Sequence, residues 1–350
     1  MNPFRKKFSV EDIPDLAGKV IIVTGGATGI GKQTVEQLLK HNAKVYVASR
    51  SKEKFEQLFN HLQSADSHMT AGLKFLELDL SDATSCISAA KHFAELEGRL
   101  DVLIANAALA VVPETLSSDG IEVQFGYFGH FVFTHSLLNL IQYTSEVFDE
   151  ARIVIVASHA HAMYKPVLPD KIDFEGLRTE GPKTMKSLAE VQASLQRYAR
   201  SKLANIIFAR RLHTHFQTRG YSNILVNCLN PGTVGTAPGT DSAALPPMFK
   251  FINSSVVRLM SIPPEDGALT TLLLATDPEI KLKSLSGRYF DVGPLAGKFY
   301  YGYSWDATDS KLSDVAKDEH LSEMLWNWSV QAEASINITT WPKDRNEDQG

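Results

Sequence analysis

The sequence has little cysteine, no long apolar run and no excess of basic residues. Its 350 residues include two cysteines, Cys86 and Cys228, which excludes a disulfide framework and a cysteine-rich metal site. Both stand among apolar residues, so we expect buried free thiols. No uninterrupted apolar stretch approaches the roughly 18 residues of a membrane-spanning helix. The formal net charge of −5 argues against a general nucleic-acid binder, which is usually basic.

The first ten residues, MNPFRKKFSV, lack the apolar core of a signal peptide. The sequence therefore predicts a soluble, cytoplasmic protein of a reducing compartment. Its composition, 44% hydrophobic and 21% charged, is that of an ordinary globular protein. The length fits either two domains or one large α/β domain with insertions. We expect a loosely packed lead-in over residues 1–17, one domain over 18–335 and a polar tail over 336–350.

The stretch from Lys19 to Gly31, KVIIVTGGATGIG, carries the strongest signal for a binding site. The apolar run Val20 to Val23 predicts a buried strand, and the apolar face within Lys32 to His41 predicts a helix. Between them, Gly25, Gly29 and Gly31 follow the spacing Gly-x-x-x-Gly-x-Gly. Glycine lets the backbone approach a pyrophosphate closely, and the first amides of a helix point at the anion. We therefore expect a dinucleotide site; the alternative is a plain glycine turn.

The rest of the chain alternates between strands and helices. Further strands are predicted at residues 43–49, 73–80, 100–108, 152–158, 223–230 and 287–292. Further helices are predicted at residues 51–63, 83–96, 121–144, 198–218, 264–276 and 318–332. This alternation predicts a single doubly wound Rossmann domain, an α/β fold with a parallel seven-stranded sheet and helices on both faces. Right-handed crossovers place the carboxyl ends of all strands along one edge, where ligands bind.

Two segments interrupt this pattern. Three prolines mark an irregular insertion over residues 164–196, with a helical piece near 183–196. Residues 233–263 are mixed and include an apolar stretch over 248–260, which we interpret as a lid over the substrate. Aromatic residues follow at 299–303. These segments predict a fairly large apolar or aromatic substrate; the alternative is that their apolar residues belong to the core.

The second chemical signal is the pair Tyr198 and Lys202. Residues four apart lie on one face of a helix, so the two side chains can act together. A free tyrosine has a pKa near 10, and a neighbouring ammonium favours the phenolate. Moving that pKa to about 7 requires roughly 4 kcal/mol. Alone, the pair is equally compatible with two surface residues.

Taken together, these motifs make the chain resemble the short-chain dehydrogenase/reductase family over about residues 17–335. The family's Thr-Gly-x-x-x-Gly-x-Gly matches Thr24 to Gly31, and its Tyr-x-x-x-Lys matches Tyr198 and Lys202. Ser158 stands where the family has its catalytic serine. Further matches are the Asn-Ala segment at Asn106, Asp79 after the third strand and Pro231-Gly232 after the sixth. Within the family, the segments 129–131, 201–205 and 325–326 look like those of the retinol-dehydrogenase group and its fungal relatives.

The resemblance implies an oxidoreductase in which Tyr198 is the general acid/base. It implies that Ser158 hydrogen-bonds the substrate oxygen, while Lys202 binds the nicotinamide ribose and lowers the pKa of Tyr198. The resemblance to the fungal relatives further suggests a role in making polyketide-type secondary metabolites. It assigns no metal. The implied cofactor-binding residues are Thr24, Gly25, Gly29, Ile30, Gly31, Arg50, Asp79, Asn106, Tyr198, Lys202, Val234 and Thr236.

Two features depart from the family pattern. The family's usual asparagine, which shapes a proton relay through water, falls on Gly126 or is deleted, so that Tyr127 or water would have to substitute. The interval between Ser158 and Tyr198 is also much longer than in the family. It must loop out, and it is expected to form part of the substrate wall. For His159 and His161, both near Ser158, we favour satisfied polar or surface histidines over active-site groups.

The choice of cofactor follows from the end of the second strand. An acidic residue there would bind the ribose hydroxyls and repel a 2′-phosphate, but Arg50 stands there instead. An arginine can form charge-assisted hydrogen bonds with a phosphate. The sequence therefore predicts NADP(H) rather than NAD(H). The alternative is that Arg50 only faces solvent.

Other functions stay open at this point. Loss of the family asparagine would fit an NADP(H)-binding sensor without turnover, whereas Ser158, Tyr198 and Lys202 favour an enzyme. A peripheral membrane enzyme is a third reading, although no amino-terminal anchor supports it. The expected partner is a small-molecule substrate, with no nucleic acid and no membrane span. A homo-oligomer is left open.

Overall fold

The computed structural model describes residues 8–110, 112–165, 174–181, 187–234, 262–291 and 312–336. In these residues, seven parallel strands form one sheet in the order β3-β2-β1-β4-β5-β6-β7. The strands are β1 (Val20–Thr24), β2 (Lys44–Ser49), β3 (Leu73–Glu77), β4 (Val102–Ala105), β5 (Ala151–Val156), β6 (Ile224–Asn230) and β7 (Arg288–Asp291). The predicted fold class, a parallel seven-stranded Rossmann sheet, is confirmed.

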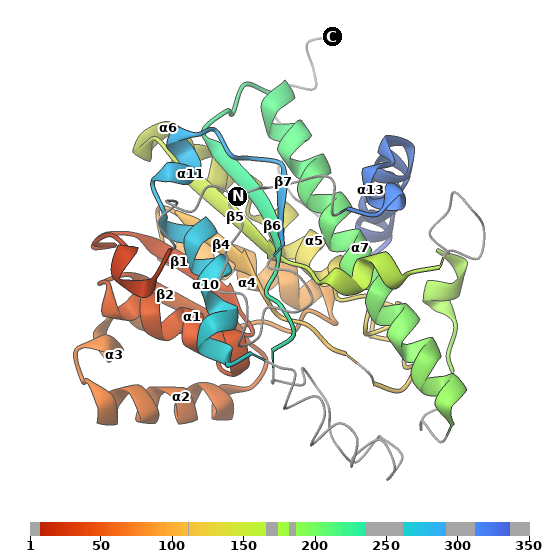
Figure 1. The fold of residues 1–350 in the computed structure, drawn as a ribbon, viewed down its shortest axis with the longest axis horizontal. Helices are drawn as coiled ribbons and strands as arrows, with labels where there is room; N and C mark the ends of the chain where they lie inside the picture. The colour runs from red at the N-terminus through yellow and green to blue at the C-terminus, as the bar shows by residue number, and fades with distance from the viewer. Residues whose placement is uncertain are drawn as a thin grey trace, which may run out of the picture.

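Helices cover both faces of the sheet (Figure 1). One face carries α1 (Gly29–Lys40), α2 (Lys52–Ala65), α3 (Met69–Gly72), α10 (Pro264–Thr276) and α11 (Glu279–Leu282). The other carries α4 (Ala83–Leu96), α5 (Tyr127–Ser136), α6 (Leu138–Phe148), α7 (Leu188–Thr218), α12 (Asp314–Lys317) and α13 (Glu319–Ser335). The described residues also contain three short 3-10 helices, η1 (Val10–Asp12), η2 (His159–Met163) and η3 (Glu175–Arg178).

The two helical layers enclose two separate cores because strand side chains alternate between the faces. In β1, Val20 and Ile22 join the core under α4, α5 and α7. Ile21 and Val23 join the core under α1 and α10. A strand buried on both faces needs a continuous apolar run, which is what the sequence has here. The free thiols of both cysteines are buried, as predicted.

The strand order reverses direction between β1 and β4. β1 pairs with β2 on one side and with β4 on the other, both in parallel register. In open α/β sheets, ligands bind at such a switch point, outside the carboxyl ends of the strands. The fold therefore places the glycine turn after β1 at the centre of the expected binding edge.

The prediction of one helix over residues 121–144 is wrong in its bounds and in its continuity. Residues 121–126 form turns, and the helix is divided into α5 and α6 at Leu137. The amide of Glu122 donates to the carbonyl of Leu177, and the amide of Val123 donates to that of Thr115. Because these amides bond to distant segments, they are not available to a helix, whatever the apolar content of the segment.

Two other expectations need correction. The helical piece near 183–196 and the helix at 198–218 are one continuous helix, α7, that begins with a capping box between Ser187 and Glu190. The lead-in is also packed more closely than predicted from residue 8 onward. Phe8, Ile13 and Leu16 are all buried in the core under α1 and α10. In the part of the chain described, none of the helices combines the length and apolarity that crossing a bilayer requires.

Candidate active site at the carboxyl edge of the sheet

Thr24, the last residue of β1, connects the ends of β1 and β4. Its Oγ1 accepts hydrogen bonds from the amides of Asn106, at 2.9 Å, and Ala107, at 3.0 Å. The same oxygen lies 2.9 Å from Nε2 of His130 on α5. In return, Nδ2 of Asn106 donates to the Thr24 carbonyl at 2.9 Å. These contacts hold two neighbouring strand ends at the switch point in a defined position.

The glycine turn after Thr24 is too tightly packed for side chains. Gly25 has φ +63°, a conformation that favours glycine. A Cβ atom at Gly31 would lie 2.4 Å from the Gly25 carbonyl oxygen and 2.7 Å from Nδ2 of Asn106. Helix α1 begins at Gly29, and the Thr28 side chain does not cap its first amides. These amides therefore remain available to an anion, which fits the diphosphate of a dinucleotide.

Ser158 and Tyr198 meet at the carboxyl end of β5. Ser158 follows this strand, and its Oγ accepts a hydrogen bond from the amide of Ala160 at 3.1 Å. Burial raises the pKa of the Tyr198 phenol, while a side-chain hydrogen bond with Ser158 lowers it. The structure thus brings together two residues that the long insertion separates in sequence.

Lys202 lies near this pair and is buried beside strand β5. Its Nζ donates to the carbonyl of Val156 at 2.8 Å and lies 5.7 Å from the centre of the Tyr198 ring. Burial lowers the pKa of Lys202 to about 8. An ammonium has three donors, so two remain after the bond to Val156. Asn205 shares the same acceptor, with Nδ2 at 3.2 Å from the Val156 oxygen.

The other predicted cofactor residues lie along the same edge. Arg50 directly follows β2 and is exposed. Asp79 follows β3, and its Oδ1 accepts from both the amide and the hydroxyl of Ser81. Ile30 and Val234 come together over α10: their side chains lie 3.4 and 2.6 Å from the position of a Cβ on Gly267. Thr236 and most of the 233–263 and 294–316 segments lie outside the described residues.

Tyr127 does not replace the missing family asparagine, which corrects one of the two alternatives above. Its side chain is buried in the core, and its hydroxyl hydrogen-bonds with Oγ of Ser329 on α13 at 2.9 Å. Gly126 is the N-cap of α5, and its carbonyl lies 3.1 Å from Nδ1 of His130. The hydroxyl of Tyr127 is therefore directed at the terminal helix α13.

Sequence reasoning did not assign His130 and Asn205 to the site. His130 is fully buried, and both of its ring nitrogens contact the site's framework, at Thr24 and Gly126. Its only signal was its place in the segment 129–131. Asn205 had a clearer signal, because it follows Lys202 by three positions on α7 and therefore lies on the same helix face.

The two histidines after Ser158 have different surroundings. His161 is buried, with Nδ1 2.9 Å from the Ser158 carbonyl and Nε2 accepting from the amide of Ser313. Burial lowers the pKa of His161. The hydrogen bond to the Ser158 carbonyl raises this pKa, and the charge of His159 lowers it further. His159 is half-exposed, with Nδ1 3.9 Å from a carboxylate oxygen of Asp291. His161 is thus a satisfied buried histidine, as expected.

We expect His130 to make the protein sensitive to mild acid. Burial, and secondarily the charge of Lys202, lowers the pKa of His130 to about 3. Because the unfolded chain binds the proton more readily, stability is lost as the pH falls from 6.5 towards 3. This group alone should remove about 2 kcal/mol between pH 7 and pH 5. Urea unfolding at both pH values measures the loss.

The matched variants for this measurement are His130→Gln and His68→Gln. His68 is exposed, so its replacement should leave the pH dependence unchanged. His130→Gln should flatten it. An equal loss of stability in wild type and His130→Gln between pH 7 and pH 5 would contradict the assignment.

Comparison with known proteins gives matches over most of the chain. The family model described as short chain dehydrogenase matches residues 19–169. A short-chain dehydrogenase/reductase of Armillaria gallica is 33% identical, covering 94% of both chains. Retinol dehydrogenase 14 of Mus musculus is 32% identical, covering 89% of this chain and 85% of its own.

A similar fold is found among solved structures. The crystal structure of a short chain dehydrogenase from Escherichia coli CFT073, complexed with NADPH, has a TM-score of 0.56 and 22% identity. The match covers 80% of this chain and 99% of the other. At this level of identity the likeness concerns the fold.

Proposed function

Since the chain belongs to the short-chain dehydrogenase/reductase family of oxidoreductases, we propose that it interconverts an alcohol and a ketone or aldehyde with NADP(H). The observation that carries this proposal is the grouping of Ser158, Tyr198 and Lys202. The Ser158 side chain lowers the pKa of the Tyr198 phenol, and the buried ammonium of Lys202 lies 5.7 Å from the centre of the Tyr198 ring. These three groups stand at the edge of the sheet where the glycine turn and the first amides of α1 can hold a diphosphate.

The cofactor would supply the hydride donor or acceptor when bound. The chain would hold it through the amides after Gly29, with Asn106 and Thr24 keeping the glycine turn in shape. The close approach at Gly31, where a Cβ would lie 2.4 Å from a carbonyl oxygen, supports a binding surface made of backbone. This surface lets an anionic ligand come close to the strand ends.

Tyr198 would move the proton at the substrate oxygen. In oxidation its phenolate takes the proton from the substrate hydroxyl, and in reduction its phenol donates one. Burial alone works against the phenolate, since it raises the pKa of Tyr198. The Ser158 hydrogen bond and the nearby positive charge of Lys202 work in the opposite direction. Ser158 would also hold the substrate oxygen in line.

Lys202 would have two tasks because its ammonium has spare donors. One N–H is held by the Val156 carbonyl, and the other two would bind the hydroxyls of the nicotinamide ribose. Fixing Nζ on β5 keeps the charge near the Tyr198 ring. The pKa of Lys202, lowered to about 8, would rise again when a polar ligand replaces the apolar surroundings.

We expect Arg50→Ala to weaken NADPH binding by about ten- to a hundredfold and to leave NADH binding unchanged. The reason is the loss of charge-assisted hydrogen bonds to the 2′-phosphate, worth roughly 1.5–3 kcal/mol. Equilibrium titration of both cofactors measures the change. Arg219→Ala, at an exposed arginine that ends α7, is the control; an unchanged preference in Arg50→Ala would refute the assignment.

The substrate is proposed to be fairly large and apolar or aromatic, of the polyketide type found in secondary metabolism. This rests on the apolar content of residues 248–260 and 299–303 and on the resemblance to fungal relatives. The test is a panel of aromatic and aliphatic ketones with NADPH, and of the matching alcohols with NADP+, following absorbance of the reduced cofactor. Turnover restricted to short hydrophilic carbonyls would contradict the substrate class.

The same panel separates the enzyme from an NADP(H)-binding sensor. The contact between Ser158 and Tyr198 supports an enzyme, because a sensor has no need to keep a proton donor hydrogen-bonded at the substrate position. Tight NADPH binding without turnover of any carbonyl or alcohol in the panel would support the sensor.

A further inference from the structure

The opposite edge of the sheet contains a cavity that the proposed reaction does not use. It has a volume of about 310 Å³ and lies at the amino ends of β1, β4 and β5, between residues 14–16 and the segment from the end of α10 through α11. Its apolar wall is formed by Leu16, Ile21, Val102, Ala275, Pro278 and Leu282. Cavities of this size are at the lower end of those that bind small molecules.

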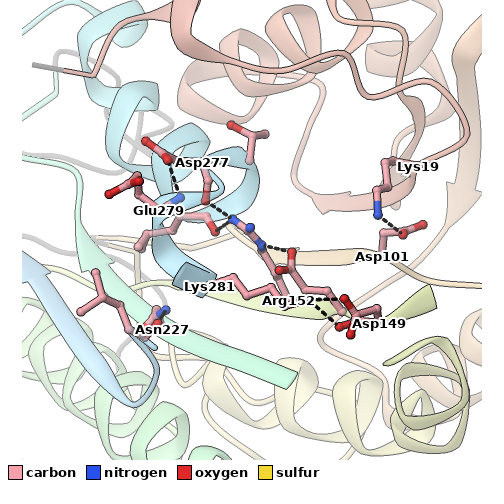
Figure 2. A network of polar contacts seen from close by, with 12 residues as sticks. Lys19, Asp101, Asp149, Arg152, Asn227, Asp277, Glu279 and Lys281 are labelled. Carbon is pink, nitrogen blue, oxygen red and sulfur yellow. Dashed lines mark hydrogen bonds and ion pairs between the residues drawn. The ribbon is translucent and has the colours of Figure 1, made fainter. Parts of the chain in front are cut away.

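Arg152, at the start of β5, is the central polar residue of this cavity. Its side chain is only 5% exposed, and it lines the cavity wall. Nε donates to Glu150 at 2.6 Å, and Nη1 donates to the carbonyls of Leu274 and Asp277 at 3.1 and 3.0 Å. Figure 2 shows this guanidinium held against the segment that follows α10.

The second terminal nitrogen of Arg152 has a different role. Within the described residues, Nη2 donates no hydrogen bond, and it is not among the buried atoms that lack a partner. It is therefore reachable from outside the protein. Since the rest of the side chain is enclosed and lines the cavity, we place Nη2 at the cavity wall, with its two N–H groups available to a ligand.

Among the residues described, three carboxylates line the cavity, those of Asp15, Asp101 and Glu150. Oδ1 of Asp15 accepts from the amide of Ala17 and from Nδ2 of Asn42. Asp101 accepts from Nζ of Lys19 at 3.1 Å, from the amide of Val20 at 2.9 Å and from two nitrogens of Arg99. Glu150 pairs with Arg152. Lys19 makes one bond to Asp101 and is 39% exposed, so its ammonium keeps further donors. Nη2 of Arg152 and the ammonium of Lys19 therefore keep donors that a ligand can use.

From these donors and the apolar wall beside them we infer that the cavity is a binding site for a small organic carboxylate with a compact apolar body. The carboxylate would bond to Nη2 of Arg152, with the Lys19 ammonium as a second donor. The apolar body would lie against Ile21, Val102 and Ala275. No group of the carboxyl edge takes part, so the site is independent of the proposed oxidoreductase chemistry.

The test uses benzoate as probe and the full chain saturated with NADPH, with binding followed by ligand-observed NMR and thermal unfolding. We expect saturable binding with a Kd in about the millimolar range or below. Benzamide, which has the same shape without the charge, should bind at least about tenfold more weakly. Inorganic phosphate, which has no apolar body, should not displace benzoate. Equal binding of benzamide, or displacement by phosphate at equal concentration, would overturn the assignment.

At Leu282, a charge of either sign can be introduced beside the cavity without disturbing the core. It lines the cavity and is 74% exposed, so both Leu282→Glu and Leu282→Lys should fold. Leu282→Glu should weaken benzoate binding by about tenfold, whereas Leu282→Lys should keep or strengthen it. Equal affinity in these two variants, or no saturable binding in wild type, would overturn the proposal. Arg152→Gln should abolish binding, provided that its thermal unfolding remains cooperative.

Discussion

Replacing Tyr198 by phenylalanine is expected to lower kcat by about a thousandfold and to leave the Kd for NADPH unchanged within about twofold. The substitution removes the hydroxyl that we propose exchanges a proton with the substrate and whose pKa the Ser158 side chain lowers. It keeps the ring that lies 5.7 Å from the Lys202 ammonium. Steady-state kinetics with a substrate found in the panel, together with a cofactor titration, measures both effects.

The control for this variant is Tyr143→Phe. Tyr143 is 50% exposed on α6, so loss of its hydroxyl should change neither kcat nor cofactor affinity. The assignment of Tyr198 as the proton donor and acceptor would be wrong if Tyr198→Phe kept more than about a tenth of the wild-type kcat, because proton transfer by a positioned group contributes at least about a hundredfold.

The second large effect is expected from Thr24→Val. The substitution keeps the shape of the side chain and removes the oxygen that accepts from the amides of Asn106 and Ala107. It also removes the partner of His130 Nε2. The amide of Ala107 would lose its acceptor, whereas the amide of Asn106 would keep the Ile104 carbonyl. This should lower the free energy of unfolding by about 1–3 kcal/mol. Because the same bonds shape the glycine turn, the affinity for NADPH should fall as well.

Thr34→Val is the matched control for this prediction. Thr34 is also buried, but its hydroxyl bonds only to the carbonyl of Ile30 within its own helix. Replacing it should therefore change stability by less than about 1 kcal/mol and leave cofactor affinity unchanged. Urea unfolding of both variants, with a cofactor titration, gives the comparison. Equal losses of unfolding free energy in Thr24→Val and Thr34→Val would contradict the role of Thr24 in holding the ends of β1 and β4 together.

Much of the fold could be predicted because its signals are local. The run Val20 to Val23 indicates a strand buried on both faces, and α4 and α10 have the predicted bounds, 83–96 and 264–276. Repeated alternation of such elements leaves few topologies open, since crossovers are right-handed. The glycine turn could be placed for the same reason, because a strand, a turn and a helix follow one another directly.

The error at residues 121–126 shows where local signals fail. The segment is apolar enough for a helix, but the amide of Glu122 bonds to Leu177, more than fifty positions away. Such a bond satisfies the backbone as well as a helix does, and no periodicity in the segment reveals it. The direction of the Tyr127 hydroxyl, towards Ser329 on α13, was hidden for the same reason.

The sequence by itself therefore determined the parallel sheet, the position of the glycine turn and the set of residues that follow its strands, because these depend on neighbours along the chain. Only the tertiary structure decided that Ser158 lies near enough to Tyr198 to lower the pKa of its phenol, that His130 bonds to Thr24, and that Nη2 of Arg152 donates no hydrogen bond within the described residues. Each of these depends on which polar atoms are satisfied by partners distant in sequence, and burial makes that pairing obligatory.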